Sequence, residues 1–143
     1  MRNVLVLVMV LVVAGVFAMA QHAYVGPEKC KMCHKVEYTS WSATKHAKAW
    51  DSLKPADQAN AKCNGCHSTN LPTLTGVSCE ACHGAGGDYW KMSVMKDQKL
   101  AVQNGLVIPD EKVCVKCHNK QSPTFKGFNY AEAKGKVHDK KAK

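Results

Sequence analysis

Every cysteine in this chain lies in one of four copies of the pattern Cys-x-x-Cys-His. In this pattern two thiols can add to the two vinyl groups of a porphyrin, and the imidazole of the next residue can then ligate the iron. Each copy would attach one haem c, so four covalently attached haems are the expected cofactors. The thioether-forming residues would be Cys30, Cys33, Cys63, Cys66, Cys79, Cys82, Cys114 and Cys117, and the proximal ligands His34, His67, His83 and His118.

Two other uses of eight cysteines compete with haem attachment, namely disulfide bonds and zinc sites. An even number of cysteines in an exported chain often forms disulfides, and four Cys-x-x-Cys pairs could build two tetrahedral zinc sites. Neither use requires a histidine directly after the second cysteine of every pair. With seven histidines in 143 residues, four chance placements have a probability on the order of 10⁻⁵. Haem attachment is the interpretation that accounts for all four.

The first twenty residues have the three parts of a secretory signal peptide. A short basic start at Arg2 precedes an apolar run from Val4 to Phe17, and Ala18-Met19-Ala20 fits a cleavage site. We expect a signal peptide over 1–20 and a single tetrahaem domain over 21–143. An uncleaved membrane anchor is the alternative, but the run falls short of about twenty residues. The expected location is periplasmic or extracellular, where haem is attached, with no membrane span after cleavage.

The chain is basic, with a formal net charge of +9. Such a charge can indicate nucleic acid or an acidic membrane surface as a partner. Four haems would bring about eight propionate groups, which largely cancel the excess. Aromatic residues do not alternate with the basic clusters, as they do where bases are stacked. We expect no nucleic-acid partner and basic side chains that neutralise propionates.

The fold class expected is mainly α with long loops, a small multihaem cytochrome c with a haem-dominated core and little or no β structure. The polypeptide core of so short a chain is modest, so four large apolar macrocycles would dominate it. Periodicity and capping residues predict a helix over 36–53 ended by Pro55, a shorter helix over 56–62, a helical turn beginning at Pro109, and a last helix over 129–138.

The spacing of the motifs predicts how the haems are distributed. Successive motifs begin 33, 16 and 35 residues apart, so the second and third haems are expected as neighbours. The stretch between them contains Pro72 and Gly76, which favours a loop over a sizeable helix. The run from Gly84 to Gly87 would either let the backbone approach a ring closely or form a flexible turn.

Histidines outside the motifs are too few to give every iron a second imidazole. Only His22, His46 and His138 remain, so one of four haems lacks an internal bis-His partner. His46 would lie on the inward face of the helix over 36–53, His138 closes the last helix, and His22 is near the mature N-terminus. The unpartnered iron could take Met92 or Met95, take a ligand from another molecule, or stay open.

Several further stretches resemble the cytochrome c-554 family of tetrahaem proteins over nearly the whole mature chain. The resemblance implies a mainly helical fold with long loops and tightly packed haem pairs, alternately parallel and near perpendicular. It is carried by residues 24–30, by Trp41 with 45–49, by 76–84, and by 122–125 leading to His138.

The same resemblance implies a set of iron ligands. His46 would ligate the third haem opposite His83, and His138 would ligate the first haem opposite His34. The family has a further distal histidine between its third and fourth motifs, which this sequence lacks, and its second haem is typically five-coordinate. Only His22 remains for the second or fourth haem.

Closely packed haems favour electron transfer between redox partner proteins as the function, with the protein setting orientation and axial ligands. Since no constellation of catalytic residues accompanies the motifs, an electron carrier is expected more than an enzyme. One alternative is a subunit of a conductive extracellular filament in which His22 is shared between subunits. Another is reduction of a small nitrogen oxide at an open haem.

Overall fold

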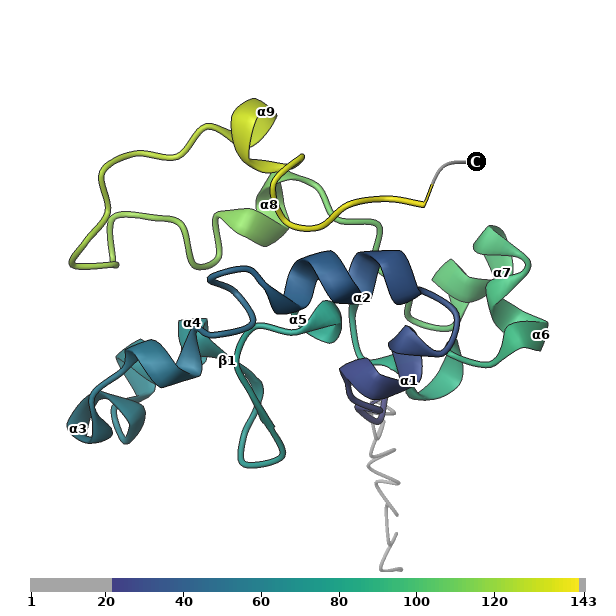
Figure 1. The fold of residues 1–143 in the computed structure, drawn as a ribbon, viewed down its shortest axis with the longest axis horizontal. Helices are drawn as coiled ribbons and strands as arrows, with labels where there is room; N and C mark the ends of the chain where they lie inside the picture. Colours follow the sequence, from purple (N-terminus) through teal and green to yellow (C-terminus); the bar gives the residue numbers. More distant parts are fainter. Residues whose placement is uncertain (1–21, 142–143) are drawn as a thin grey trace, which may run out of the picture.

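The computed structural model describes residues 22–141, and the expected signal peptide over 1–20 lies outside them. The described chain is mainly helical with one two-stranded sheet, which confirms the expected fold class (Figure 1). Its α-helices are α1 (Pro27–Lys31), α2 (Lys35–Ser42), α3 (Pro55–Gln58), α4 (Ala61–His67), α5 (Cys79–His83), α6 (Met92–Met95), α7 (Gln98–Gln103), α8 (Glu111–Cys114) and α9 (Tyr130–Ala133); the 3₁₀ helices are η1 (Trp50–Ser52) and η2 (Gly86–Asp88), and the strands β1 (Ser68–Asn70) and β2 (Leu74–Thr75).

Helices α1, α2 and α5 occupy the middle of the molecule (Figure 1). Helix α1 contacts both α2, which follows it, and α5, which comes much later in the chain. Helices α3 and α4 pack on each other at one end of the long axis, and α6 and α7 do so at the other (Figure 1). Helices α8 and α9, joined by a long loop, lie along the side of α2 (Figure 1). The four motifs are therefore spread through the molecule.

The prediction of one helix over 36–53 is wrong. Helix α2 ends at Ser42, turns follow over 43–49, and η1 begins at Trp50. Just beyond α2 the Thr44 hydroxyl donates to the Trp41 carbonyl oxygen at 2.7 Å, in competition with the helix backbone. His46 therefore lies in a turn and not on a helix face.

The other predicted helices begin where expected but are shorter. The stretch 56–62 is divided between α3 and α4, because the Asn60 side chain caps α4 by accepting from the Lys62 N–H at 3.0 Å. Helix α9 begins after Asn129, whose side chain accepts from the Glu132 N–H at 3.3 Å. It ends at Ala133, two residues before Gly135, a residue that weakens a helix, and does not reach 138.

Strands β1 and β2 form a small antiparallel hairpin between the second and third motifs. The hairpin is fastened to the start of α5 by Thr69, whose hydroxyl accepts from the Ser78 N–H at 2.8 Å and donates to the Gly76 carbonyl oxygen at 2.8 Å. The segment between these motifs thus holds no long helix, as its Pro and Gly content predicted.

Few apolar side chains are buried by the polypeptide itself. Within residues 22–141, Tyr89 and Ala101 are the apolar residues with buried side chains. A chain of this length that relied on its own core would bury many more. None of the helices that the structure describes is long and apolar enough to cross a membrane.

Candidate haem-binding motifs and their ligands

Each Cys-x-x-Cys-His motif forms about one turn of helix. The second and third motifs lie wholly within α4 and α5. In the first, the His34 N–H donates to the Cys30 carbonyl oxygen at 2.9 Å, and in the fourth the His118 N–H donates to that of Cys114 at 3.0 Å. Because positions i, i+3 and i+4 of a helix share one face, both thiols and the imidazole of a motif lie on the same side. This is the placement that one porphyrin edge and its iron require.

The cysteines and their surroundings do not support the two competing interpretations. All eight cysteines are free. Among residues 22–141, no group of three or more His, Cys, Asp and Glu side chains is placed to hold a metal ion. The donor set in each motif is a pair of thiols and one imidazole, which fits a haem.

Backbone carbonyl groups orient two of the motif imidazoles. The Nδ1 atom of His67 lies 2.8 Å from the Ala49 carbonyl oxygen, and that of His83 lies 3.2 Å from the Val107 carbonyl oxygen. Donation from Nδ1 leaves the lone pair on Nε2, the atom that would face the iron. Burial also lowers the pKa of His83 and keeps its ring neutral, as a metal ligand must be.

Two motif histidines face a second imidazole from a distant part of the chain. The ring centroids of His83 and His138 are 6.3 Å apart, and those of His118 and His46 are 5.9 Å apart. Two imidazoles on opposite sides of a metal, each with a nitrogen about 2.0 Å from it, have ring centroids roughly 6 Å apart. Both pairs have this spacing, and burial lowers the pKa of His46, so its ring is also neutral.

These pairs differ from those that the family resemblance implied. The resemblance placed His46 opposite His83 and His138 opposite His34, whereas the structure places His46 beside His118 and His138 beside His83. That His46 and His138 are distal ligands stays a prediction, and so does the iron that each would ligate.

Backbone hydrogen bonds explain where the two distal candidates lie. The His46 carbonyl oxygen accepts from the Val77 N–H at 3.0 Å, which holds the turn over 43–49 next to the hairpin. The Asp139 N–H donates to Ser40 Oγ at 2.7 Å, so the chain directly after the last histidine is fastened to α2. Both contacts join segments far apart in sequence.

The thiols show which motifs are neighbours. A hydrogen bond with Cys79, followed by burial, raises the pKa of the Cys30 thiol. Burial, followed by a hydrogen bond with Cys66, raises the pKa of Cys117 to about 12. Burial and then the charge of Cys114 raise the pKa of Cys82. A thiol of the first motif thus lies beside one of the third, and a thiol of the fourth beside one of the second, while Cys82 of the third motif is within range of the charge of Cys114 in the fourth. The expected pairing of the second and third haems stays a prediction.

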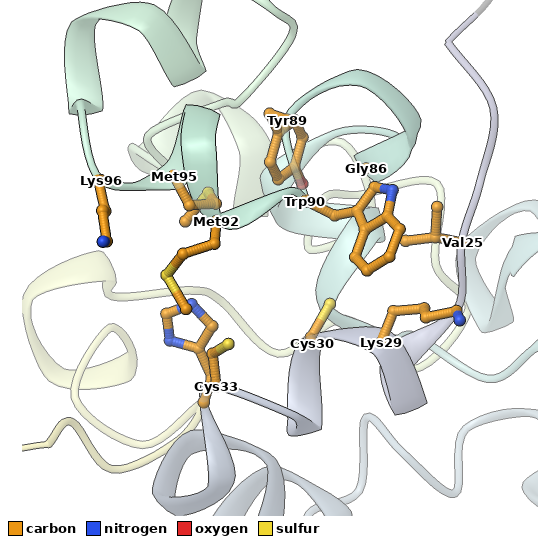
Figure 2. Close-up of a pocket in the computed structure, with 11 residues that line it drawn as sticks. Val25, Lys29, Cys30, Cys33, Gly86, Tyr89, Trp90, Met92, Met95 and Lys96 are labelled. Atoms are coloured by element: carbon orange, nitrogen blue, oxygen red, sulfur yellow. The ribbon is translucent and has the colours of Figure 1, made fainter.

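A cavity of about 210 Å³ lies over the first motif (Figure 2). Its walls include Cys30, Cys33 and His34 on one side and Trp90, Met92 and Met95 on the other. In Figure 2 the side chain of Met92 reaches across the cavity toward Cys33, and Trp90 lies above Cys30. Lys29 and Lys96 line the same cavity and are cations suited to haem propionates.

Glu80 is a site residue that no sequence motif singles out. It lies between the two cysteines of the third motif, it is 2% exposed, and its carboxylate accepts from the N–H groups of Val25 at 2.9 Å, Gly26 at 2.8 Å and Gly86 at 2.6 Å. An acidic residue between the two cysteines of a motif could have suggested a structural role. Its partners could not be predicted, because Val25 and Gly26 are more than fifty residues away in the sequence and Gly86 lies in η2 after the motif. Glu80 fixes α5 against the start of α1.

The glycine run after the third motif brings backbone close to backbone. A Cβ atom at Gly84 would lie 2.6 Å from the Gly105 carbonyl oxygen, and one at Gly87 would lie 2.7 Å from that of Ala23. The Gly87 N–H also donates to Ala23 O at 2.7 Å. In the structure the partners of this glycine run are the N-terminal segment and the loop after α7, and its approach to a haem ring stays a prediction.

His22 lies apart from the other histidines. Its Nδ1 is 2.5 Å from the Asp88 carboxylate, its ring packs against Gly105, and it is exposed. It does not line the cavity over the first motif. Its role as an iron ligand stays a prediction.

Comparison with known proteins places these motifs in a family. The family described as Cytochrome c554 and c-prime matches residues 29–84, which include the first three motifs. Cytochrome c-554 of Nitrosomonas europaea is 32% identical over 148 residues, covering 76% of this chain and 63% of that protein. The chain thus spans less than two thirds of that relative. The solved structure of reduced cytochrome c554 from Nitrosomonas europaea matches with a TM-score of 0.57 and 29% identity, over 78% of this chain and 73% of that one.

Proposed function

Because this chain belongs to the cytochrome c554 family, whose members bind covalently attached haem c, we propose that it transfers electrons between redox partner proteins through four haems. The observation that carries the proposal is the closeness of the motifs. Helix α1 packs on α5, where Glu80 of the third motif accepts from the N–H groups of Val25 and Gly26, and a thiol of the fourth motif lies beside one of the second. Haems attached to motifs this close can pass electrons from one to the next. Residues 21–143 would form the single domain that holds them.

The residues present fit the haem in defined roles. The eight motif cysteines form the thioether bonds, and His34, His67, His83 and His118 are the proximal ligands. His138 and His46 complete the third and fourth irons, in line with their ring separations of 6.3 and 5.9 Å. The haem supplies the redox chemistry, while the protein keeps the imidazoles neutral and oriented. A periplasmic or extracellular location follows from the expected signal peptide, where donor and acceptor proteins would be met.

One observation favours a second function at the second haem. His67 Nδ1 is hydrogen-bonded to the Ala49 carbonyl oxygen and to the Ser52 hydroxyl. Among residues 22–141, the rings of His46 and His138 lie beside other motif histidines and not beside His67. An iron ligated by His67 alone would have one open position, at which a small nitrogen oxide could bind and be reduced.

The filament alternative depends on His22. A histidine shared between subunits must be able to reach the iron of a neighbouring molecule. His22 is exposed, and its contact with a side chain of its own molecule is the hydrogen bond with Asp88. Solution mass separates the two functions, because a carrier runs as a monomer and a filament subunit assembles end to end.

The haem count and the iron spin states test the proposed function. The intact mass of the purified protein should exceed the polypeptide mass by four haems, and electron paramagnetic resonance of the oxidised protein should count the low-spin irons. His46→Ala should convert one low-spin haem to high spin, and so should His138→Ala, because each removes one distal imidazole. Ser42→Ala, whose hydroxyl bonds only within α2, is the control and should leave the spin count unchanged. A mass equal to the bare polypeptide contradicts the proposal.

A further inference from the structure

Glu80 places a carboxylate between the first and third motifs, and this inference rests on the proposed function, since it concerns the haems attached there. The residue lies within the third motif and is 2% exposed. Its carboxylate accepts from the N–H groups of Val25, Gly26 and Gly86. Val25 and Gly86 also line the cavity over the first motif, together with Cys30 (Figure 2). The carboxylate therefore lies directly behind one wall of that cavity.

No ion pair neutralises this carboxylate within the part of the chain that the structure describes. None of the three ion pairs among residues 22–141 includes Glu80. The partners of its oxygens are uncharged backbone N–H groups, which stabilise an ionised carboxylate without cancelling its charge. A net negative charge is thus fixed at a buried position.

This charge acts on groups around the first motif. A hydrogen bond with Cys79 contributes most to the raised pKa of the Cys30 thiol, and the negative charge of Glu80 contributes as well. Burial, followed by the charges of Cys30 and Glu80, raises the pKa of the Tyr89 hydroxyl. Tyr89 is buried and lines the cavity over the first motif. The field of Glu80 is therefore felt at the first motif as well as at the third.

We propose that Glu80 lowers the reduction potentials of the third and first haems. A ferric haem carries one more positive charge than a ferrous haem, so a fixed negative charge nearby stabilises the ferric form. Burial preserves this effect, because a buried charge is screened by salt much less than an exposed one. A unit charge about 10 Å from a redox centre, at an effective dielectric constant of about 20, changes the equilibrium constant for reduction by roughly tenfold. The third haem, whose motif contains Glu80, is affected most.

The test is a redox titration of the wild-type holoprotein and three variants, followed by electron paramagnetic resonance. Glu80→Gln removes the charge at nearly constant volume, whereas Glu80→Asp keeps the charge but shortens the side chain and so disturbs its hydrogen bonds. Glu28→Gln is the matched control, since Glu28 lies beside the first motif but is exposed and paired with Lys31 at 3.5 Å. Intact mass gives the haem count of each protein. NMR contacts between the thioether methyl groups and the motif cysteines assign each potential to a haem.

In Glu80→Gln we expect the equilibrium constant for reduction of the third haem to rise about tenfold, which is about 59 mV for one electron. The first haem should rise by a smaller factor. Glu80→Asp and Glu28→Gln should change every potential by less than about threefold, because the first keeps the buried charge and the second removes a charge that water and salt already screen.

Four haems in Glu80→Gln with unchanged potentials overturn this role of Glu80 but not the proposed function. An equal rise in Glu80→Asp also overturns it, because hydrogen bonding and not charge would then set the potential. Where Glu80→Gln does not retain four haems, Glu80→Asp decides: an unchanged potential of the third haem supports the role of the charge, and a tenfold rise overturns it. A wild-type protein without haem at these motifs would instead contradict the proposed function.

Discussion

At the scale of single residues, Glu80 shows how a charge is kept inside a haem motif. Its carboxylate is 2% exposed and accepts three backbone N–H groups at 2.6 to 2.9 Å. A buried carboxylate is costly unless its lone pairs are used, and charge-assisted hydrogen bonds are the stronger kind. Glu80 therefore stabilises the contact between α5 and the segment before α1, where the first and third motifs meet.

Replacing this carboxylate with an amide tests that role. In Glu80→Gln the amide group presents its own N–H donors to backbone N–H groups, so at least one buried donor loses its acceptor. We expect the free energy of unfolding of the holoprotein to fall by about 1–3 kcal/mol, measured by guanidinium denaturation. Glu111→Gln, at an exposed position in α8, is the control and should change stability by less than about 0.5 kcal/mol. Equal effects of the two changes would contradict the assignment.

At the scale of elements, the segment over 138–141 is positioned by α2. The Asp139 N–H donates to Ser40 Oγ at 2.7 Å, and the Lys141 N–H donates to Glu37 Oε1 at 3.0 Å. The second hydrogen bond lowers the pKa of Glu37 and keeps it charged. This segment has no helical structure of its own, so these contacts decide where His138 lies.

Removing one acceptor on α2 should loosen the C-terminal segment. Ser40→Ala deprives the Asp139 N–H of its partner, at a cost of about 1 kcal/mol, which corresponds to roughly fivefold faster amide exchange at Asp139. Hydrogen exchange followed by NMR measures this rate. Ser42→Ala is the matched control, because Ser42 Oγ bonds only within α2, to the Thr39 carbonyl oxygen at 2.8 Å. The same exchange rate in both variants would show that Ser40 does not hold the segment.

At the scale of the whole molecule, the polypeptide alone has little core. The buried apolar side chains within residues 22–141 are Tyr89 and Ala101, and the helices there are eight residues or shorter. Helices of this length are unstable without tertiary packing. The haems must therefore supply most of the apolar surface that folding removes from water.

The chain produced without haem should consequently not fold. Its far-UV circular dichroism should be that of a coil, and heating should give no cooperative transition, because the conformational entropy is not offset by burial. The holoprotein at the same concentration is the control and should show helix and a cooperative transition. A cooperative transition in the haem-free chain would mean that the polypeptide carries its own core.

Much of the local structure could be predicted because it depends on neighbours in sequence. Asn129 and Asp110 cap helices that begin where periodicity and capping predicted. The ends of helices were not predictable in this way. Helix α2 stops at Ser42 and α9 at Ala133, and the segments beyond them hydrogen-bond to the hairpin and to α2 instead. Tertiary hydrogen bonds there outweigh a weak helix propensity.

The sequence by itself determined the chemistry of attachment, since two thiols and an imidazole within five residues specify a haem whatever surrounds them. The tertiary structure alone decided which side chains lie near each motif imidazole. His46 lies by the fourth motif, His138 by the third, and Met92 across the cavity from the first. The physical reason is range: covalent attachment needs only adjacent residues, whereas distal ligation depends on contacts between segments tens of residues apart.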